Sequence, residues 1–320
     1  MPTPQLPDLS VRQLEYLDAV TRAPTWATAA AELGVTPSAL SQGLAELERR
    51  LGVPLFERQG RRRVPTDAAG PVIDHARRVL NQTADLARWA ADRRHGRTGR
   101  LRVGMIDAAA VGHHPEALRT FRRQRPDVEL HLTVAPSAPL LAQLGRGELD
   151  VVVCVEPGTA EVATASLAGE VDLVPLLDEP LAVYGPQGEA GPGCRRGVGP
   201  TGWGPWVLFP EGSHTRALIT GALLAEGARV DVVAESHQPE VLREMVRLGM
   251  GWTVLPVVQA EHPPDPLRPV RRAALTSRTL VAARRAHALP DPAADALVEL
   301  LTTGGRPRRP SRHPHRGVAT

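Results

Sequence analysis

Lysine is absent from this 320-residue chain, and all 38 of its basic residues are arginine. A pyridoxal-phosphate enzyme needs a lysine amine to form its Schiff base, and a P-loop needs a lysine to hold nucleotide phosphates. The absence of lysine therefore excludes both classes of protein.

Cysteine and long apolar runs are scarce as well. The two cysteines, Cys154 and Cys194, are too few for a disulfide framework and suit a reducing compartment. Cys154 lies in the run V-V-V-C-V, which predicts a buried side chain. No run of 18 apolar residues occurs, and residues 1–9 lack the basic cluster and apolar segment of a secretory signal. We therefore expect a cytoplasmic protein without a membrane partner.

The charge is unevenly spread along the chain. Residues 1–100 carry a net charge of +4, residues 101–302 carry −6, and residues 303–320 carry +5. A basic first segment on a mildly acidic body favours DNA binding at one end. The last segment is rich in Gly, Pro, Arg and His, which predicts a disordered tail over 303–320. Its arginines suit either non-specific DNA affinity or an inert tail.

The stretch 26–58 predicts a helix pair. Gly34 should end the first helix, because glycine accepts the left-handed conformation of a C-terminal cap. Thr36 is a suitable N-cap, and Pro37 fits the first position of the second helix. That helix has one apolar face, formed by Leu40, Leu44, Leu47 and Leu51. Its N-terminal half carries Ser38, Ser41, Gln42 and Ala45 on another face, as in a helix that reads the major groove. The spacing alone fits an amphipathic bundle equally well.

A basic hairpin follows the helix pair. Residues 54–58 predict a strand, Gln59-Gly60 a tight turn, and residues 61–64 the returning strand. Its arginines are Arg58, Arg61, Arg62 and Arg63. A helix pair with such a hairpin is typical of a winged DNA-binding domain, in which arginines reach phosphates or the minor groove.

Two further helices flank this domain. Ser10 and Gln13 form a capping box that predicts a supporting helix. Thr66 is expected to cap a helix that runs to about Arg94, with apolar positions about 3.5 residues apart and a length of roughly 42 Å. We interpret this helix as a dimerising coiled-coil linker over 66–95, although a helix packed on its own domain is an alternative. Pro71 should kink it, or the helix should begin later than Thr66.

An α/β region follows a hinge at residues 95–99. Strands are predicted over 101–106, 128–134 and 149–155, with helices over 115–125 and 140–145. This alternation favours βαβ units on a parallel sheet. A second set has strands over 181–184, 206–209, 230–234 and 252–255, with helices after Ser213 and from Pro239. Strands over 267–270 and 280–284 and a helix over 292–301 should return to the first set. Residues 185–205 are rich in Gly and Pro and predict an exposed excursion.

Three segments of the N-terminal region closely resemble one family. They are A-A-A-E-L-G-V-T-P-S-A-L-S-Q, L-E-R-R-L-G-V-P-L-F-E-R and G-R-R-R-V-P-T-D-A-A-G. They resemble the DNA-binding domain of LysR-type transcriptional regulators, densely over 10–70 and more weakly to about 302. G-M-G-W-T-V-L-P (249–256) resembles the glycine-rich turn of the family's effector domain. In this chain Pro37 stands where many members carry glutamine, and Gly43 stands where a polar or bulky residue is usual. Both departures remove side chains that could touch DNA.

The resemblance implies a multidomain α+β protein. A winged helix-turn-helix (1–65) and a linker helix (66–95) would precede two doubly wound α/β lobes like those of periplasmic binding proteins. Lobe 1 would comprise 100–178 and 270–302, and lobe 2 would comprise 179–269. The implied partners are an interrupted palindrome in double-stranded DNA, a small-molecule effector, RNA polymerase and further copies of the chain. The linker helix would form a homodimer, and the effector lobes would pair further into a homotetramer.

The candidate site residues form two sets. The predicted DNA contacts are Thr28, Thr36, Pro37, Ser38, Ser41, Gln42, Arg58, Arg61, Arg62 and Arg63. The predicted effector contacts lie after strands and at helix starts, where ligands bind in doubly wound folds: Asp107, Ala108, Ala109, Pro136, Ser137, Ser213, His214, Ser236, His237, Trp252 and Thr253. Many family members have serine or threonine where this chain has Asp107. Asp107 either caps the next helix or selects a ligand with an amine or several hydroxyls.

Enzyme motifs are weak. Gly212-Ser213-His214 lacks the second glycine of a G-x-S-x-G elbow. His113-His114 with Glu116 lacks the i, i+4 spacing of a helical zinc site. We therefore expect no enzyme, no metal and no cofactor. The alternative function is a solute-binding or small-molecule-sensing module without specific DNA readout.

Overall fold

The chain divides into two compact units in a computed structural model that describes residues 8–60, 62–94, 99–158, 171–186 and 199–304. The first unit comprises Met1–Arg97 with His287–Leu289, and the second comprises Thr98–Ala286 with Pro290–Thr320. No helix of the described residues is long and apolar enough to cross a membrane.

The first unit is built on three short helices: α1 (Val11–Arg22), α2 (Trp26–Glu32) and α3 (Pro37–Leu51). The predicted capping box is confirmed, because the Ser10 hydroxyl accepts from the Gln13 amide and the Gln13 side chain accepts from the Ser10 amide. Gly34 has φ of +65°, as its role in ending α2 requires. The Thr36 hydroxyl accepts from the Ala39 amide at 3.1 Å and so caps α3. The apolar face of α3 is buried at Leu40, Leu44 and Leu47.

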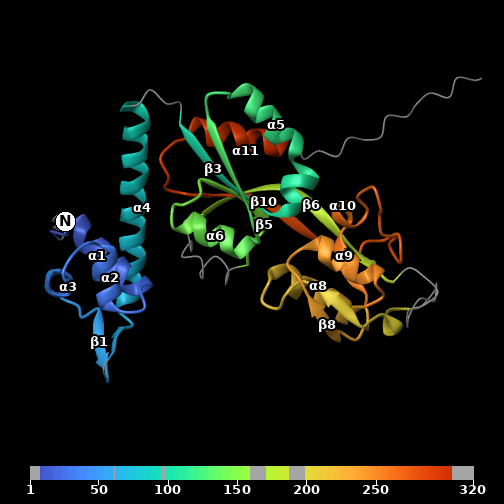
Figure 1. Ribbon diagram of the computed structural model, residues 1–320, viewed down its shortest axis with the longest axis horizontal. Helices are drawn as coiled ribbons and strands as arrows, with labels where there is room; N and C mark the ends of the chain where they lie inside the picture. The colour runs from blue at the N-terminus through green and yellow to red at the C-terminus, as the bar shows by residue number, and fades with distance from the viewer. Residues whose placement is uncertain (1–7, 61, 95–98, 159–170, 187–198, 305–320) are drawn as a thin grey trace, which may run out of the picture. The chain divides into compact units, whose positions relative to one another are not determined.

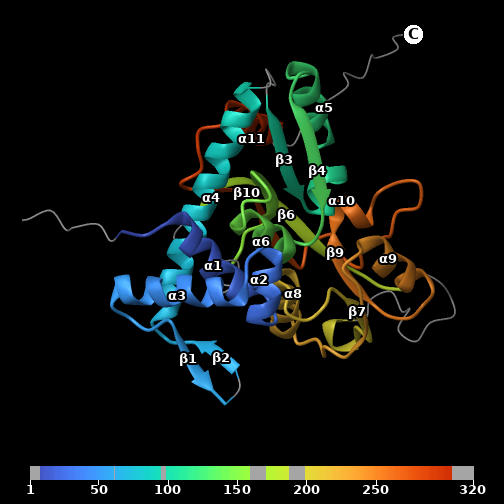
Figure 2. The same ribbon diagram turned by 60° about the vertical axis from the view of Figure 1, so that its left-hand side comes forward.

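The basic hairpin also forms. Strand β1 (Phe56–Gln59) pairs antiparallel with β2 (Arg62–Pro65), and the hairpin extends away from the three helices (Figures 1 and 2). The Glu48 carboxylate holds its base by accepting from the Leu55 and Phe56 amides at 2.7 and 3.0 Å. On the other strand, the Thr66 hydroxyl donates to the Pro54 carbonyl at 2.8 Å. These contacts fix the hairpin to the end of α3.

The long helix α4 (Ala69–Arg94) begins later than Thr66, which confirms one of the two outcomes predicted from Pro71. Thr66 was expected to be its cap, which is wrong, because the Thr66 side chain bonds to Pro54. Pro71 is then the third residue of α4, where a missing amide hydrogen costs no intrahelical bond. The N-terminal half of α4 packs against the core of the first unit through Ala69, Ile73 and Ala76, whereas Leu86 and Trp89 farther along are 55% and 51% exposed.

The second unit is organised around a six-stranded mixed sheet with the order β4-β3-β5-β10-β6-β9. Its strands are β3 (Arg100–Met105), β4 (Glu129–Val134), β5 (Val151–Val155), β6 (Val171–Tyr184), β9 (Thr253–Pro256) and β10 (Thr276–Arg285). Only the β3–β4 and β3–β5 pairs are parallel, while β10 runs antiparallel to both β5 and β6. The parallel arrangement predicted for the strands over 101–106, 128–134 and 149–155 is therefore confirmed. A second, two-stranded parallel sheet contains β7 (Trp206–Leu208) and β8 (Val232–Glu235).

Helices cover these sheets, with α5 and α11 on one side of the large sheet and α6 on the other (Figure 1). The helices are α5 (Pro115–Gln124), α6 (Ser137–Gly145), α8 (His214–Ala225), α9 (Pro239–Arg247), α10 (Val257–Ala260) and α11 (Pro292–Gly304), with a π-helical turn η1 (Ala108–His113) and a 3-10 turn η2 (Pro200–Gly202). Cys154 is fully buried in β5, as predicted.

Two hydrophobic cores lie at the two ends of the large sheet. The first core is built mainly from β3, β5, α6 and α11, and the second from β7, α8, α9 and β9. Strand β6 contributes Leu173 and Leu177 to the first core and Leu181 and Val183 to the second. We refer to the two cores with their surrounding elements as lobe 1 and lobe 2; the limits of the lobes, 100–178 with 270–302 and 179–269, stay a prediction.

Several predicted elements differ from the structure. The strand predicted over 181–184 is the end of the 14-residue β6. The strand predicted over 267–270 is wrong, because only Pro269 forms an isolated bridge, with Tyr184. The excursion over 185–205 is not exposed throughout, since Trp203 is only 6% exposed and stacks on Trp252. Residues 303 and 304 belong to α11, and the rest of the predicted tail lies outside the described residues.

Gly43 has a packing role that the sequence did not reveal. A Cβ atom at this position of α3 would lie 2.5 Å from the Cδ2 atom of the Tyr16 ring on α1. A side chain at position 43 would therefore point at α1, so the inference that glycine removes a DNA contact there is wrong. The glycine lets α1 and α3 approach each other closely.

We expect Gly43→Ala to destabilise the first unit by about 1–3 kcal/mol, because the added methyl group must displace the Tyr16 ring. In a Tyr16→Ala background the same substitution should instead stabilise by about 0.5–1 kcal/mol, the gain of alanine over glycine inside a helix. Thermal unfolding of the four proteins measures both effects. Equal effects of Gly43→Ala in the two backgrounds would contradict the packing role.

Candidate functional site

The N-terminal half of α3 presents polar side chains to solvent. Thr36, Pro37, Ser38 and Gln42 are exposed, and Ser41 is half-buried. The leucines of α3 face inward, so the predicted separation of an apolar and a polar face is confirmed. Small and hydrogen-bonding side chains at the start of an exposed helix suit the edges of bases in a major groove.

Helix α2 adds Thr28 beside this face. The Thr25 hydroxyl caps α2 by accepting from the Thr28 amide at 3.1 Å. The hydroxyls of Thr25 and Thr28 also lie within hydrogen-bonding distance, 2.8 Å. Both hydroxyls keep further hydrogen-bonding capacity, which suits a phosphate at a helix N-terminus.

The arginines of the hairpin differ in their surroundings. Arg58 and Arg63 occupy paired positions on β1 and β2, and Arg62 is exposed at the start of β2. The Arg63 guanidinium lies over the ring of Trp26, 4.5 Å from its centroid. Trp26 in turn packs edge-on against Phe56 of β1, with ring centroids 5.1 Å apart. This stack fixes the hairpin against the start of α2; Arg61 lies outside the described residues.

Trp26 was missed by the sequence reasoning. It begins α2, and its partners Phe56 and Arg63 lie on the hairpin, far along the chain. No local pattern pairs these residues, since the contact depends on how the hairpin folds back. The stack holds the Arg63 guanidinium beside the start of α2. A cation–π contact of this kind stabilises the folded state by roughly 0.5–1 kcal/mol at an exposed site.

Asp107 lies between the two lobes of the second unit. It follows β3 and precedes η1, but its side chain makes no capping bond, so the capping interpretation is wrong. Instead, Gln259 Nε2 of α10 donates to Asp107 Oδ2 at 2.7 Å. Burial raises the pKa of the Asp107 carboxyl, the charge of Glu240 raises it further, and the bond from Gln259 opposes both.

The other predicted effector residues of lobe 1 lie next to this position. Ala108 and Ala109 are buried in η1, so they offer only backbone groups to a ligand. Pro136 precedes α6, and the Ser137 hydroxyl accepts from the Val155 amide at 3.3 Å. Ser137 thus holds the start of α6 against the end of β5.

The predicted residues of lobe 2 divide into two groups. Ser213 caps α8 by accepting from the Arg216 amide, and a Cβ at Gly158 would lie 3.7 Å from His214 Nδ1. His214 therefore lies beside the segment that leaves β5. The Ser236 hydroxyl accepts from the Gln238 amide, and His237 is exposed. The second group, Trp252 and Thr253, is buried in the core at 3% and 0% exposure, and Trp252 Nε1 and Thr253 Oγ1 have no hydrogen-bond partner within the described part of the chain. Their effector contact stays a prediction.

A buried polar network between the lobes was also missed. Glu179 of β6 accepts from Arg278 Nε of β10 at 2.6 Å, and its other oxygen lies 2.7 Å from His113 Nε2 of η1. Arg278 also donates to the Thr215 hydroxyl of α8 at 2.9 Å. Burial opposes ionisation of Glu179, but the bond from His113 and the charge of Arg278 outweigh it and lower its pKa.

The network joins η1, β6, β10 and α8. Sequence reasoning weighed His113 only as an inadequate zinc ligand, because its partners lie far along the chain. The neighbouring His114 is 1% exposed, and burial followed by the charge of His113 lowers its pKa to about 4. The described residues contain no group of three or more His, Cys, Asp or Glu side chains that could hold a metal ion.

Comparison with known proteins identifies both units. Residues 11–70 match the model of the bacterial regulatory helix-turn-helix protein, lysR family, and residues 94–306 match that of the LysR substrate binding domain. The chain belongs to the LysR family. As a LysR-family protein it is a DNA-binding transcriptional regulator with an effector-binding domain.

Relatives and solved structures agree with this assignment. The DNA-binding transcriptional dual regulator OxyR of Escherichia coli (strain K12) is 31% identical over 262 residues, which cover 80% of this chain and 81% of OxyR. A full-length, singly substituted OxyR from Pseudomonas aeruginosa superposes with a TM-score of 0.58 at 25% identity, covering 93% of this chain and 95% of that one. CbnR in complex with its target DNA has the same fold, with a TM-score of 0.57 at 20% identity, covering 92% of this chain and 100% of CbnR.

Asp107 should cost this LysR-family protein stability at neutral pH. A carboxyl whose pKa is raised by folding stabilises the folded state only while protonated, and that contribution is lost as the pH rises through the raised pKa. We expect Asp107→Asn to melt at a higher temperature than the unsubstituted chain at pH 7, with the difference vanishing in acid below the ordinary aspartate pKa. Glu148→Gln, which removes an exposed charge, is the control. A lower melting temperature for Asp107→Asn at pH 7 would refute the assignment.

Proposed function

We propose that this regulator binds an interrupted palindrome in double-stranded DNA as a dimer and responds to a small molecule held between its lobes. In this proposal the dimers pair further into tetramers and contact RNA polymerase. The protein acts in the cytoplasm, uses no cofactor and catalyses no reaction. The main support is the exposed polar start of α3 beside a hairpin rich in arginine.

The two parts of the DNA interface would have different tasks. Ser38, Ser41 and Gln42 can donate to and accept from base edges, so they would read the sequence. Arg58, Arg62 and Arg63 carry charge without a matching base pattern, so they would bind phosphates or the minor groove. Thr28 and Thr36 would anchor the starts of α2 and α3 to the backbone. Pro37 would bring only apolar surface to the groove.

Helix α4 supplies the support for a dimer. Leu86 and Trp89 lie three residues apart, which places them on one face of the helix, and both are more than half exposed. Large apolar side chains on one helical face favour a second helix as partner. Two copies of α4 would hold two winged domains at the fixed separation that an interrupted palindrome requires.

The lobes supply the support for effector control. Asp107 and Gln259 already join η1 to α10 by a hydrogen bond across the boundary between the lobes. Ser137, Ser213, His214, Ser236 and His237 lie at helix starts and strand ends, where ligands of doubly wound folds bind. A ligand that holds the lobes differently would change how dimers pack and how they bend DNA, provided that it binds one arrangement more tightly.

The first experiment is selection of bound fragments from sheared genomic DNA of the source organism, followed by sequencing. An interrupted palindrome shared by the enriched fragments would support the proposal, and the neighbouring genes would nominate effectors. Enrichment without any shared motif would contradict specific readout and favour the sensing module as the alternative function.

Arg62→Ala should weaken binding to all DNA sequences and reduce the slope of log K against log salt by about 0.9, since one phosphate contact is lost. Gln42→Ala should instead relax the preference at one base pair, at a cost of about 1–3 kcal/mol. Titrations of the selected site and its single-base variants over a range of salt concentrations separate the two roles. Arg119→Ala, which removes an exposed charge from lobe 1, is the control. A loss confined to one base position in Arg62→Ala would contradict its phosphate role.

Dimer formation should depend on the exposed face of α4. We expect the double substitution Leu86→Glu and Trp89→Glu to yield monomers, because two charges would be buried in an apolar contact. Ala84→Glu, which adds a charge to an exposed position on the opposite side of α4, should leave the dimer intact. Sedimentation velocity distinguishes the species. Persistence of the dimer in the double variant would exclude this face as the interface.

A further inference from the structure

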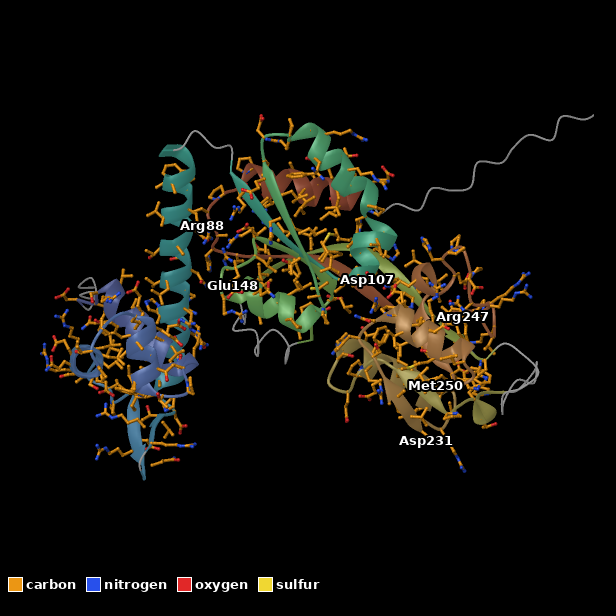
Figure 3. All side chains as sticks on the ribbon, in the orientation of Figure 1. Arg88, Asp107, Glu148, Asp231, Arg247 and Met250 are labelled. Atoms are coloured by element: carbon orange, nitrogen blue, oxygen red, sulfur yellow. The ribbon has the colours of Figure 1, made fainter. Side chains whose placement is uncertain are left out.

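Asp107 and Gln259 meet at the boundary between the lobes, and the charge of Glu240 acts on Asp107. Asp107 follows β3, Gln259 lies on α10, and the exposed Glu240 lies in the first turn of α9. Gly112 packs against Val258, which shows how tightly η1 approaches α10: a Cβ on Gly112 would lie 3.1 Å from a Val258 methyl carbon. Figure 3 shows Asp107 on the side of lobe 1 that faces α9 and α10.

Gln259 leaves an acceptor unused at this point. Its side chain is 7% exposed, and Nε2 donates to Asp107. Its Oε1 atom is buried and has no hydrogen-bond partner within the described part of the chain. Because Oε1 and Nε2 share one amide carbon, the orphaned oxygen lies beside the Asp107 carboxylate. A buried amide oxygen without a donor destabilises the folded state, and a ligand that donates to it would relieve that cost.

The two carboxylates lack a neutralising cation among the described residues. No ion pair forms to Asp107 or Glu240 there, whereas the arginines of α9 are turned elsewhere. Arg243 donates to the Asp265 carbonyl at 2.7 Å, and Arg247 Nε lies 3.1 Å from Asp265 Oδ2. The charge of Glu240 acts on Asp107 and raises its pKa, in addition to the effect of burial. The site therefore offers acceptors and negative charge.

We propose that Asp107 and Gln259 bind a protonated amine of the effector, with the charge of Glu240 nearby, and that this ammonium group ties lobe 1 to lobe 2. The inference rests on the proposed function, because it names the ligand class of the same inter-lobe site. An ammonium group has three donors and no acceptor, which matches a site whose free groups only accept. A hydroxyl would satisfy Gln259 but leave the carboxylates without a counter-charge, and an anionic group would be repelled.

Binding of an ammonium group should change the protonation of Asp107. A nearby positive charge favours the carboxylate, so it would lower the pKa of Asp107, which burial and the charge of Glu240 raise. Complex formation in mildly acidic buffer should therefore release protons. Calorimetry in two buffers of different ionisation enthalpy detects this release, and a purely structural bond between Asp107 and Gln259 would give none.

The test compares matched probes on the 320-residue chain. The amines are 1,4-diaminobutane, 1,5-diaminopentane and L-lysine, the neutral control is 1,4-butanediol, and the metal controls are Mg²⁺ and Ca²⁺ alone. We expect at least one amine to raise the melting temperature and to bind with proton release, and the diol to do neither. Asp107→Asn should lower the affinity for that amine at least about tenfold, in line with the loss of a charge-assisted hydrogen bond.

Two further variants define the site. Gln259→Met keeps the length of the side chain without the amide and should also weaken binding of the amine. Glu148→Gln, at a position of lobe 1 remote from Asp107 (Figure 3), should leave binding of the amine unchanged. The proposal is overturned if no amine exceeds the diol, if Asp107→Asn binds the amine unchanged, or if a metal ion alone gives the effect that Asp107→Asn abolishes. Fluorescence anisotropy on the selected DNA keeps the two conclusions apart. If the unsubstituted chain binds the selected DNA specifically but does not respond to amines, this inference alone is overturned. If the chain shows no specific DNA binding, the proposed function is overturned.

Discussion

The ion pair between Glu179 and Arg278 is the interaction on which the effector unit depends. Glu179 is fully buried and Arg278 is 7% exposed, so neither charge could be stable there without the other. They lie on β6, which contributes to both hydrophobic cores, and on β10, which pairs with it. His113 and Thr215 extend the pair to one element of each lobe. The network therefore fixes the relative position of the lobes at β6 and β10.

The boundary is held more lightly at η1 and α10. There the described polar contact is one hydrogen bond between Asp107 and Gln259, and it leaves an amide oxygen without a donor. A fully paired buried network resists change, whereas an incompletely paired one gains from a ligand. In the proposal above, the adjustable contact is therefore the one at Asp107, and the fixed contact is the one at Glu179. Small molecules can shift an arrangement only by their differential affinity, so a weak native contact is where such a shift is easiest.

The DNA-binding domain could be predicted almost completely from the sequence, because its signals are local. The capping box at Ser10, the turn at Gly34 and the cap at Thr36 each lie within a few residues of the group they satisfy. The errors in this domain are all long-range. Thr66 bonds to Pro54 rather than to the helix that follows it, and Gly43 is required by Tyr16 on another helix.

The effector unit was predicted less completely for the same reason. Strands β3 and β4 were found because apolar residues alternate along them, and β5 because it is apolar throughout, but only the end of β6 was recognised. Its first part carries Pro175 and several acidic residues, which hide a strand that pairs with β10 from Val171 to Leu181. The candidate site shows the same limit. Asp107 could be selected by position, whereas Gln259 and Glu240 could be joined to it only by the fold.

The chemistry at Asp107 follows from what the fold leaves unpaired. Ionising a half-buried carboxyl of raised pKa at neutral pH costs stability, so a sequence optimised for stability alone would have a neutral side chain in place of Asp107. Proteins tolerate such a loss of stability chiefly at functional sites. The arginines of α9 could have neutralised the boundary between the lobes, but they bind the segment around Asp265 instead. Because this chain has no lysine, a short flexible ammonium group is also the one kind of cation that its own side chains cannot supply. A ligand amine would provide that group, and it would do so where the two lobes meet.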